Sequence, residues 1–218
     1  MDLFPLYNSI RIALISTIVT FFIGIFLAYQ IKKLPGWAKG VVDVILTLPL
    51  VLPPTVIGFF LLKILGTNSL IGQFFETLNV NLIMRWYSAI FACVLVSFPL
   101  MYRTSRAAFE SFDENIIFAG QTLGKSNTWI FWRLILPNSK NEIIAGLILA
   151  FSRALGEYGA TSMIAGYIPN KTATISTTIY QLWRIGNDSL AYKWSLINIL
   201  ISFIVLFTIN IFEKNKGR

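Results

Sequence analysis

Several apolar stretches of roughly 20 residues dominate this 218-residue chain and limit the folds that it can adopt. The hydrocarbon core of a bilayer is about 30 Å thick, so a helix needs about 20 apolar residues to cross it. Backbone N–H and C=O groups find no water there, and a helix satisfies them within one segment. The sequence therefore predicts an all-α integral membrane protein with five spans, at Ile12–Ile31, Val44–Leu62, Trp86–Tyr102, Ile143–Ala165 and Trp194–Phe212.

The composition agrees with a membrane class and argues against several others. Hydrophobic residues make up 56% of the chain and charged residues 13%, which is about half the charged fraction of a typical soluble domain. Cys93 is the only cysteine, so an intrachain disulfide is impossible. Because the chain also has no histidine, a structural zinc or haem site is not expected. We therefore expect no cofactor bound by this chain.

Positive charges are unevenly distributed among the connectors, and this asymmetry predicts the orientation. With five spans, one side of the membrane holds three cations in the first connector, five in the third and three in the tail, which are 11 of the 18 Lys and Arg. That side is expected to be cytoplasmic, with the N-terminus outside a cell (inner) membrane and the C-terminus inside. The net charge of +8 then reflects topology, since no basic face typical of nucleic-acid binding is present. The cations counted are Lys32, Lys33, Lys39, Arg103, Arg106, Lys125, Arg133, Lys140, Lys214, Lys216 and Arg218.

A segment of mixed polarity, Asp113 to Pro137, separates the third predicted span from the fourth. Its first part has the spacing of a short amphipathic helix that a soluble partner could reach. Asp113 is placed to cap this helix and Gly124 to end it, with a turn at Ser126 and Asn127. The apolar side of the helix comprises Ile116, Ile117, Gly120 and Leu123, and the polar side comprises Glu114, Gln121 and Lys125.

This segment resembles the coupling loop of ABC-importer permeases, whose signature is Glu-Ala-Ala, three residues, Gly, nine residues and Ile-x-Leu-Pro. Phe118 stands where the signature has Glu, and Gly120 stands where it has the second Ala. Loss of the Glu removes the polar contact that the family usually makes at that point. The positions that match are Ala119, Gly124, Leu136 and Pro137, with Leu134 in place of the Ile.

Two further segments resemble molybdate-type permeases. Arg153–Ile175, RALGEYGATSMIAGYIPNKTATI, looks like the fourth-span signature of that family, and Pro49–Phe59, PLVLPPTVIGF, looks like its second span. The resemblance covers nearly the whole chain and implies a single permease domain, residues 1–218, of the type I ABC importer fold with a coupling loop at 103–142. It also implies the membrane-spanning subunit of an ATP-driven importer of molybdate, with sulfate or tungstate as the alternative substrate.

The resemblance implies partners as well. Two copies of the chain would surround a shared pathway, and each would dock on a cytoplasmic ATPase dimer that binds ATP and Mg²⁺. An extracytoplasmic oxyanion-binding protein would deliver substrate to the external loop Gly166–Thr178. The run Ile175–Trp183 is too short and too rich in Thr to span, so it belongs to the same external connection. The residues expected to couple the chain to the ATPase are Asp113, Ala119, Gly120, Leu123, Gly124, Leu136 and Pro137.

One motif resembles the phosphate-binding loop of nucleotide-binding proteins, which are a different class. Gly120 to Ser126 reads G-x-x-x-G-K-S, one residue short of the phosphate-binding loop G-x-x-x-x-G-K-[ST]. That loop needs a buried strand before it, whereas an amphipathic helix precedes this one, and Ala119 stands where the first Gly should be. The chain is therefore not expected to be an enzyme, and ATP hydrolysis would take place in a partner. A non-transporting membrane anchor for a soluble enzyme is the alternative from another class.

Arg153 and Glu157 are charged residues inside the fourth predicted span. Arg153 lies roughly 15 Å from the start of that span, near the bilayer centre, where a charge is expensive and usually faces a bundle interior or a wet cavity. Arg153 could supply positive potential along the path of an oxyanion. Alternatively, the two residues lie one helical turn apart and neutralise each other, which fixes the packing of the helix.

The second predicted span contains prolines that interrupt its helix, Pro49, Pro53 and Pro54. A helix that restarts after Pro54 directs its free N–H groups and positive dipole end into the membrane interior, where they and Thr55 could contact a passing anion. A simple kink for helix packing explains the same prolines. The candidate pathway residues are Pro53, Pro54, Thr55, Arg153, Glu157 and Thr161.

Overall fold

The computed structural model describes residues 2–32 and 34–214, with side chains as far as residue 208. The described residues form helices joined by turns and loops, with no strand among them, which confirms the all-α prediction. Lys33, Lys216 and Arg218, which were counted toward the orientation, lie outside the described residues. The helices are α1 (Phe4–Ile31), α2 (Gly36–Thr47), η1 (Leu48–Leu50), α3 (Pro54–Leu65), α4 (Leu70–Thr77), α5 (Ser88–Glu110), α6 (Glu114–Thr122), α7 (Asn127–Ile130), η2 (Phe131–Ile135), α8 (Leu136–Asn138), α9 (Lys140–Leu155), α10 (Gly159–Ile164), α11 (Ile175–Arg184) and α12 (Asp188–Lys214).

Three helices within the described part of the chain are long and apolar enough to cross a membrane, namely α1, α5 and α12. Two further pairs meet the same criteria together but are bent at a short break. The pair of 36–50 with α3 is bent by 104°, and the pair of 127–138 with α9 is bent by 72°. The number of spans by length and composition is thus three, or up to five if each bent pair is one span.

The second predicted span has the break that its prolines suggest. α2 ends at Thr47, a 3₁₀ turn follows, and α3 begins at Pro54. Proline is well suited to the first turn of a helix because its missing N–H would have no partner there in any case. The predicted restart of a helix at this position is therefore confirmed.

The fourth predicted span, Ile143–Ala165, is wrong as a single helix. α9 ends at Leu155, and a separate helix, α10, begins at Gly159. The carboxylate of Glu157 accepts a hydrogen bond from the backbone N–H of Ala160 at 2.8 Å, which supplies a partner for the first turn of α10. Glu157, flanked by Gly156 and Gly159, interrupts the apolar pattern here. Small and charged residues also occur within continuous helices of a packed bundle, so the pattern alone does not fix the break.

Small and short polar residues allow α1, α5 and α9 to pack closely at the centre of the molecule. A Cβ atom on Gly24 of α1 would lie 2.9 Å from Cγ of Met101 on α5, and one on Gly146 of α9 would overlap Thr104. Close approach of this kind drives helix association where lipid removes the hydrophobic advantage. The buried residues that α1 contributes include Ala13, Ser16, Thr20, Gly24 and Ala28.

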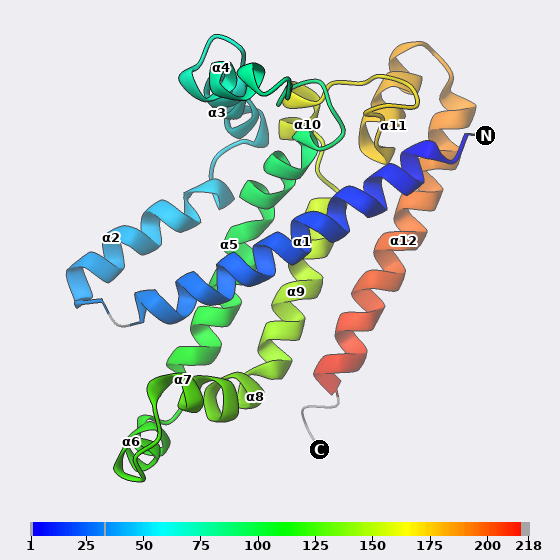
Figure 1. Cartoon of the computed structure of the whole chain (residues 1–218). Helices are drawn as coiled ribbons and strands as arrows, with labels where there is room; N and C mark the ends of the chain where they lie inside the picture. Colours follow the sequence, from blue (N-terminus) through cyan, green and yellow to red (C-terminus); the bar gives the residue numbers. More distant parts are fainter. Residues whose placement is uncertain (1, 33, 215–218) are drawn as a thin grey trace.

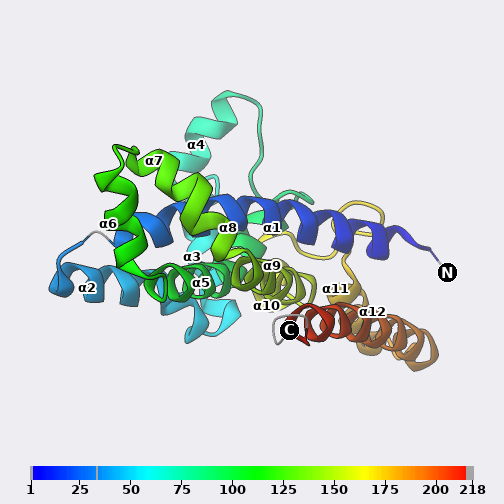
Figure 2. The same ribbon diagram turned by 90° about the horizontal axis from the view of Figure 1, so that it is seen from below.

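The two ends of the bundle carry different elements (Figure 1). α6, α7 and α8 gather at one end, and α4, α10, α11 and the start of α1 lie at the other. α12 runs from the α11 end toward the end that carries α6. Figure 2 shows α1 and α12 on opposite sides of α9. α11 has only 10 residues, far below the length needed to span, and Thr174 caps it through a reciprocal capping box with Thr177.

Candidate functional site

The first candidate region is α6 with the turn that follows it. One carboxylate oxygen of Asp113 accepts a hydrogen bond from the N–H of Asn115 at 2.9 Å, and Gly124 ends the helix with φ of +72°. Both predicted roles are confirmed. Ser126 differs from the prediction, since its hydroxyl accepts from the N–H of Trp129 at 3.2 Å and thereby starts α7.

Gly120 holds α6 against the rest of this region. A Cβ atom at Gly120 would lie 3.2 Å from two side-chain carbons of Ile130, so the absence of a side chain allows α6 and α7 to approach closely. Ile116, Phe118 and Leu123 are exposed, the last by 75%. Apolar side chains in this arrangement are typical of a surface that a partner covers.

Of the remaining predicted coupling residues, Ala119 and Gly124 are exposed, and no atom lies within 4 Å of a Cβ built on Gly124. Leu136 and Pro137 lie in α8, just before the bend into α9. Leu136 is half-buried against a core cluster, whereas Pro137 is exposed. The structure thus places the predicted coupling residues at one end of the bundle.

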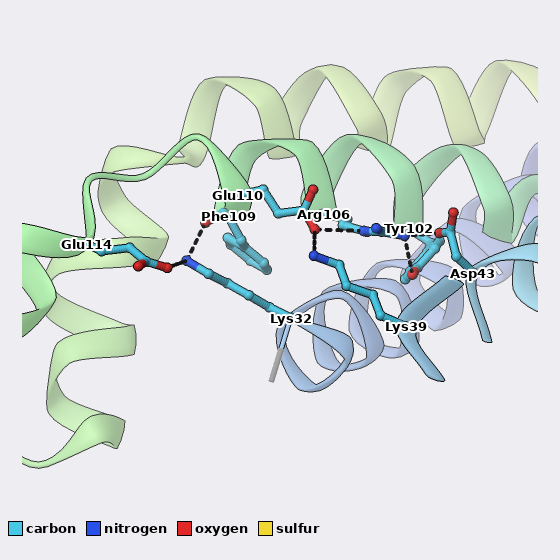
Figure 3. Close-up of polar contacts among 8 residues, drawn as sticks. All are labelled: Lys32, Lys39, Asp43, Tyr102, Arg106, Phe109, Glu110 and Glu114. Atoms are coloured by element: carbon cyan, nitrogen blue, oxygen red, sulfur yellow. Dashed lines mark hydrogen bonds and ion pairs between the residues drawn. The ribbon is translucent and has the colours of Figure 1, made fainter. Parts of the chain in front are cut away.

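One ion pair links the start of α6 to the end of α1, and three more lie on α5 or join it to α2 (Figure 3). The ammonium of Lys32, directly after α1, lies 3.8 Å from a Glu114 oxygen and donates to the carbonyl of Phe109 at 3.0 Å. Arg106 pairs with Glu110 at 3.0 Å on α5. Two further pairs, Arg106 with Asp43 and Lys39 with Glu110, connect α5 to α2.

Sequence reasoning treated these cations only as markers of topology and missed the network. The four-residue spacing of Arg106 and Glu110 was the only available signal. Partly exposed pairs contribute about 0–1 kcal/mol each, so the network positions helix ends more than it stabilises the fold.

The second candidate region contains Arg153 and Glu157. An Nη atom of Arg153 lies 2.7 Å from one carboxylate oxygen of Glu157, and the other oxygen accepts the N–H of Ala160. The Glu157 side chain is 1% exposed and that of Arg153 is 32% exposed. Arg153 and Glu157 thus form the ion pair that was expected if they neutralise each other. Part of the Arg153 side chain nevertheless remains accessible to solvent.

The breaks in the second and fourth predicted spans meet in space. A Cβ atom on Gly159 would lie 2.9 Å from Cβ of Pro54 and 3.3 Å from the backbone N of Thr55. Further along the same contact, a Cβ on Gly58 would lie 2.9 Å from Cα of Ala160. The start of α3 therefore lies directly against the start of α10.

The other predicted pathway residues have unequal access. Pro53 and Thr55 are exposed, whereas Thr161 is 1% exposed and its hydroxyl lies 4.0 Å from the buried sulfur of Cys93. Thr161 thus faces the packed interior.

A hollow of about 400 Å³ that sequence reasoning missed adjoins the α9–α10 break and is lined by Gly156, Tyr158, Ser176, Ile179, Tyr180 and Trp183. Within the described residues, no group of His, Cys, Asp and Glu could hold a metal ion.

Comparison with solved structures finds proteins with the same arrangement of helices. Among solved structures, a bacterial ABC transporter involved in the import of the acidic polysaccharide alginate superposes with a TM-score of 0.77 at 19% identity. The match covers 97% of this chain and 79% of that chain. At this level of identity the likeness concerns the fold alone.

Proteins found by sequence comparison have a higher identity to this chain. YvgM of Bacillus subtilis (strain 168), a candidate molybdenum transport system permease protein, is 37% identical over 206 residues, which are 94% of this chain and 91% of that protein. The molybdenum transport system permease protein ModB of Escherichia coli (strain K12) is 34% identical over 200 residues, or 91% of this chain and 87% of that protein. Residues 20–216 match the family described as binding-protein-dependent transport system inner membrane component. The chain therefore belongs to this family of inner-membrane transport components.

Proposed function

We propose that this chain is the membrane-spanning permease subunit of an ATP-driven importer that moves molybdate into the cytoplasm. The observation that carries the proposal is similarity to molybdenum transport permeases over more than nine-tenths of the chain. The adjacent breaks at Pro54 and Gly156–Tyr158 add support, because interrupted helices form substrate sites in other transporters. A simple membrane anchor needs neither these breaks nor a charged pair between them.

The pathway that we propose passes the start of α3 and the accessible side of Arg153. The exposed Thr55 would present its hydroxyl to an anion, and Arg153 would add positive potential. The N–H groups of Val56 and Ile57 already donate to the carbonyl of Pro53, so they contribute only through the helix dipole. Glu157 reduces that potential, so the site would bind a dianion weakly. Weak binding suits a permease, since an anion that is held tightly would not be released.

The partners that we propose are a second copy of the chain, a cytoplasmic ATPase dimer and an extracytoplasmic binding protein. α6 would dock on the ATPase through the exposed Ile116, Phe118 and Leu123, since these apolar side chains have no cover in a single chain. Closure of the ATPase pair would then move α6 together with the helices that Lys32 and Glu114 link. ATP hydrolysis would belong to the partner, and this chain would not be an enzyme.

Sulfate is a second candidate substrate. The probable sulfate transport system permease protein cysT of Chlorokybus atmophyticus is 30% identical over 94% of this chain. Molybdate, tungstate and sulfate are all tetrahedral dianions, so one pathway could pass each of them. Selection among them would then depend largely on the binding protein.

Substrate-stimulated ATP hydrolysis tests the proposal. The chain would be reconstituted in liposomes with its ATPase and binding protein, and molybdate, tungstate and sulfate would be compared. Stimulation by molybdate with inert sulfate is the expected result. Stimulation by sulfate alone would change the substrate but keep the transporter. If no oxyanion stimulated an assembled complex, the importer proposal would fail and the membrane anchor would replace it.

A further inference from the structure

Three cationic side chains line one pocket at the end of the bundle opposite α6. Arg11 comes from α1, Arg85 lies in the turn three residues before α5 begins at Ser88, and Lys171 lies in the connection from α10 to α11. Trp86 and Asn170 also line this pocket, which has a volume of about 320 Å³. Asn170 and Lys171 belong to the loop that is expected to meet the binding protein, and no lining residue belongs to the pathway or the coupling region. The inference rests on the geometry of the pocket and does not depend on the proposed function.

Packing and hydrogen bonds hold Arg11 in this pocket. Its guanidinium donates to the Asn8 side-chain oxygen at 3.3 Å and lies 3.5 Å from the centre of the Trp86 ring. Asn8 is fully buried and is itself held by the carbonyl of Ala173 at 3.0 Å. Nε of Arg11 is buried and has no hydrogen-bond partner within the described structure. A buried donor without a partner is costly, so the guanidinium of Arg11 is incompletely satisfied within the described structure.

Among the described residues, no carboxylate forms an ion pair with the three cations of this pocket. The ion pairs of the described residues involve other cations, and Arg11, Arg85 and Lys171 take part in none of them. Asp2 accepts a hydrogen bond at 3.0 Å from the N–H of Phe4, which lines the pocket, so one carboxylate lies beside it and the three cations outnumber this charge. Three like charges around one hollow attract an anion.

The position of the pocket identifies the chemistry of that anion. Arg85 lies three residues before α5 begins, at the level where a bilayer changes from hydrocarbon to headgroup, and Arg11 reaches the same pocket from seven residues inside α1. Trp86 beside them is typical of the same level. A guanidinium matches the geometry of phosphate oxygens, and basic pockets at membrane surfaces bind lipid headgroups.

We propose that this pocket binds a phosphate-type oxyanion group. The group is carried either by the headgroup of an anionic phospholipid such as phosphatidylglycerol or by a free tetrahedral oxyanion. In both cases Arg85 and Lys171 attract the charge, and Arg11 supplies the fixed donors at the base of the pocket. Trp86 in the lining favours the lipid headgroup, because Trp is enriched at the membrane interface.

The test removes charge only at exposed positions, so that folding is preserved. The full-length chain is placed in nanodiscs containing equal amounts of phosphatidylglycerol and phosphatidylcholine, and retained lipid is measured by native mass spectrometry. Wild-type protein should retain phosphatidylglycerol. The double variant Arg85→Gln/Lys171→Gln should reduce this preference about fivefold for each charge removed. Lys193→Gln, at an exposed cation of α12 at the same end, is the matched control and should retain the lipid.

A second measurement separates the two sources. Inorganic phosphate is titrated calorimetrically onto the chain in nanodiscs of phosphatidylcholine alone. Binding that the double variant loses would assign the pocket to free oxyanions, whereas lipid retention without phosphate binding would assign it to the headgroup. If wild-type protein and the double variant behave alike toward both ligands, the proposed site does not exist.

Discussion

At the scale of single residues, Glu157 joins two elements through its two carboxylate oxygens. One oxygen pairs with Arg153 on α9, and the other accepts the N–H of Ala160 in the first turn of α10. The carboxylate is almost completely buried, whereas the guanidinium retains access to solvent. Loss of Arg153 would therefore leave a buried charge without a partner, whereas loss of Glu157 would leave a charge that solvent can reach.

This asymmetry predicts the order of stability among variants. Arg153→Gln leaves a buried carboxylate without its cation and should lower the free energy of unfolding by about 3 kcal/mol. Glu157→Gln should cost less, since an amide oxygen still accepts the N–H of Ala160 and Arg153 reaches solvent. The double variant Arg153→Gln/Glu157→Gln should be more stable than Arg153→Gln alone, because it buries no unpaired charge. Thermal unfolding in detergent measures all three, and strictly additive effects would contradict the coupling.

The double variant Arg153→Gln/Glu157→Gln also shows whether Arg153 serves helix packing or oxyanion transport. It should fold with the helix contacts preserved but without positive charge at position 153. If Arg153 attracts the oxyanion, uptake should fall while assembly remains normal. Normal uptake would limit the pair to packing.

At the scale of elements, the turn at Gly124 is predicted to contact the ATPase. Asn tolerates positive φ far better than most residues, so Gly124→Asn should keep the turn with a cost below about 1 kcal/mol. No atom of the described chain lies within 4 Å of a Cβ at this position, so a new side chain would clash only with a partner. We expect weakened co-purification of the ATPase with an unchanged melting temperature.

Gly186 provides the matched control for this substitution. It has φ of +76°, ends α11 at the opposite end of the bundle, and likewise has no atom within 4 Å of a Cβ. Gly186→Asn should cost the same in stability and leave co-purification intact. Equal loss of the ATPase in both variants would remove the coupling role of Gly124.

The contact between α3 and α10 gives a second prediction at this scale. Gly159→Ala would place a Cβ 2.9 Å from Pro54, so α3 must move, at a cost of about 1–3 kcal/mol. Gly156→Ala is the control, since its Cβ would meet only the carbonyl of Ser152 at 3.6 Å, and its effect should stay within about 0.5 kcal/mol. Chemical unfolding in detergent compares the two, and a tolerated Gly159→Ala would show that the helices do not depend on this close approach.

Some of these elements could be predicted from the sequence, and others could not. The restart at Pro54 was predictable, because proline excludes a continuous helix whatever surrounds it. The break between α9 and α10 was not predicted, although Gly156, Glu157 and Gly159 interrupt the apolar pattern, because small and charged residues also occur in continuous helices of a packed bundle. It depends on Glu157 bonding to Ala160 and on α10 packing against α3.

At the scale of the whole molecule, the charge distribution predicts the N-terminus outside and the α6 end inside. Cys93 is the only cysteine and is buried, so a cysteine introduced elsewhere reports its own accessibility. Ser189 and Leu123 are exposed at opposite ends. In intact cells, Ser189→Cys should react with a membrane-impermeant maleimide, and Leu123→Cys should react only after the cells are opened. The reverse pattern would invert the orientation, and the unmodified chain should remain unlabelled.

Composition and the spacing of apolar and proline residues were enough to establish a helical membrane class, the cap and stop of α6, and the restart at Pro54. These properties follow from local chemistry, since hydrocarbon, helix ends and proline impose the same demands in any fold. Residues far apart along the chain come together where α3 meets α10, in the ion pairs between α2 and α5, and in the cation-lined pocket of Arg11, Arg85 and Lys171. Such contacts depend on how helices pack against one another, and a one-dimensional pattern carries no record of that packing.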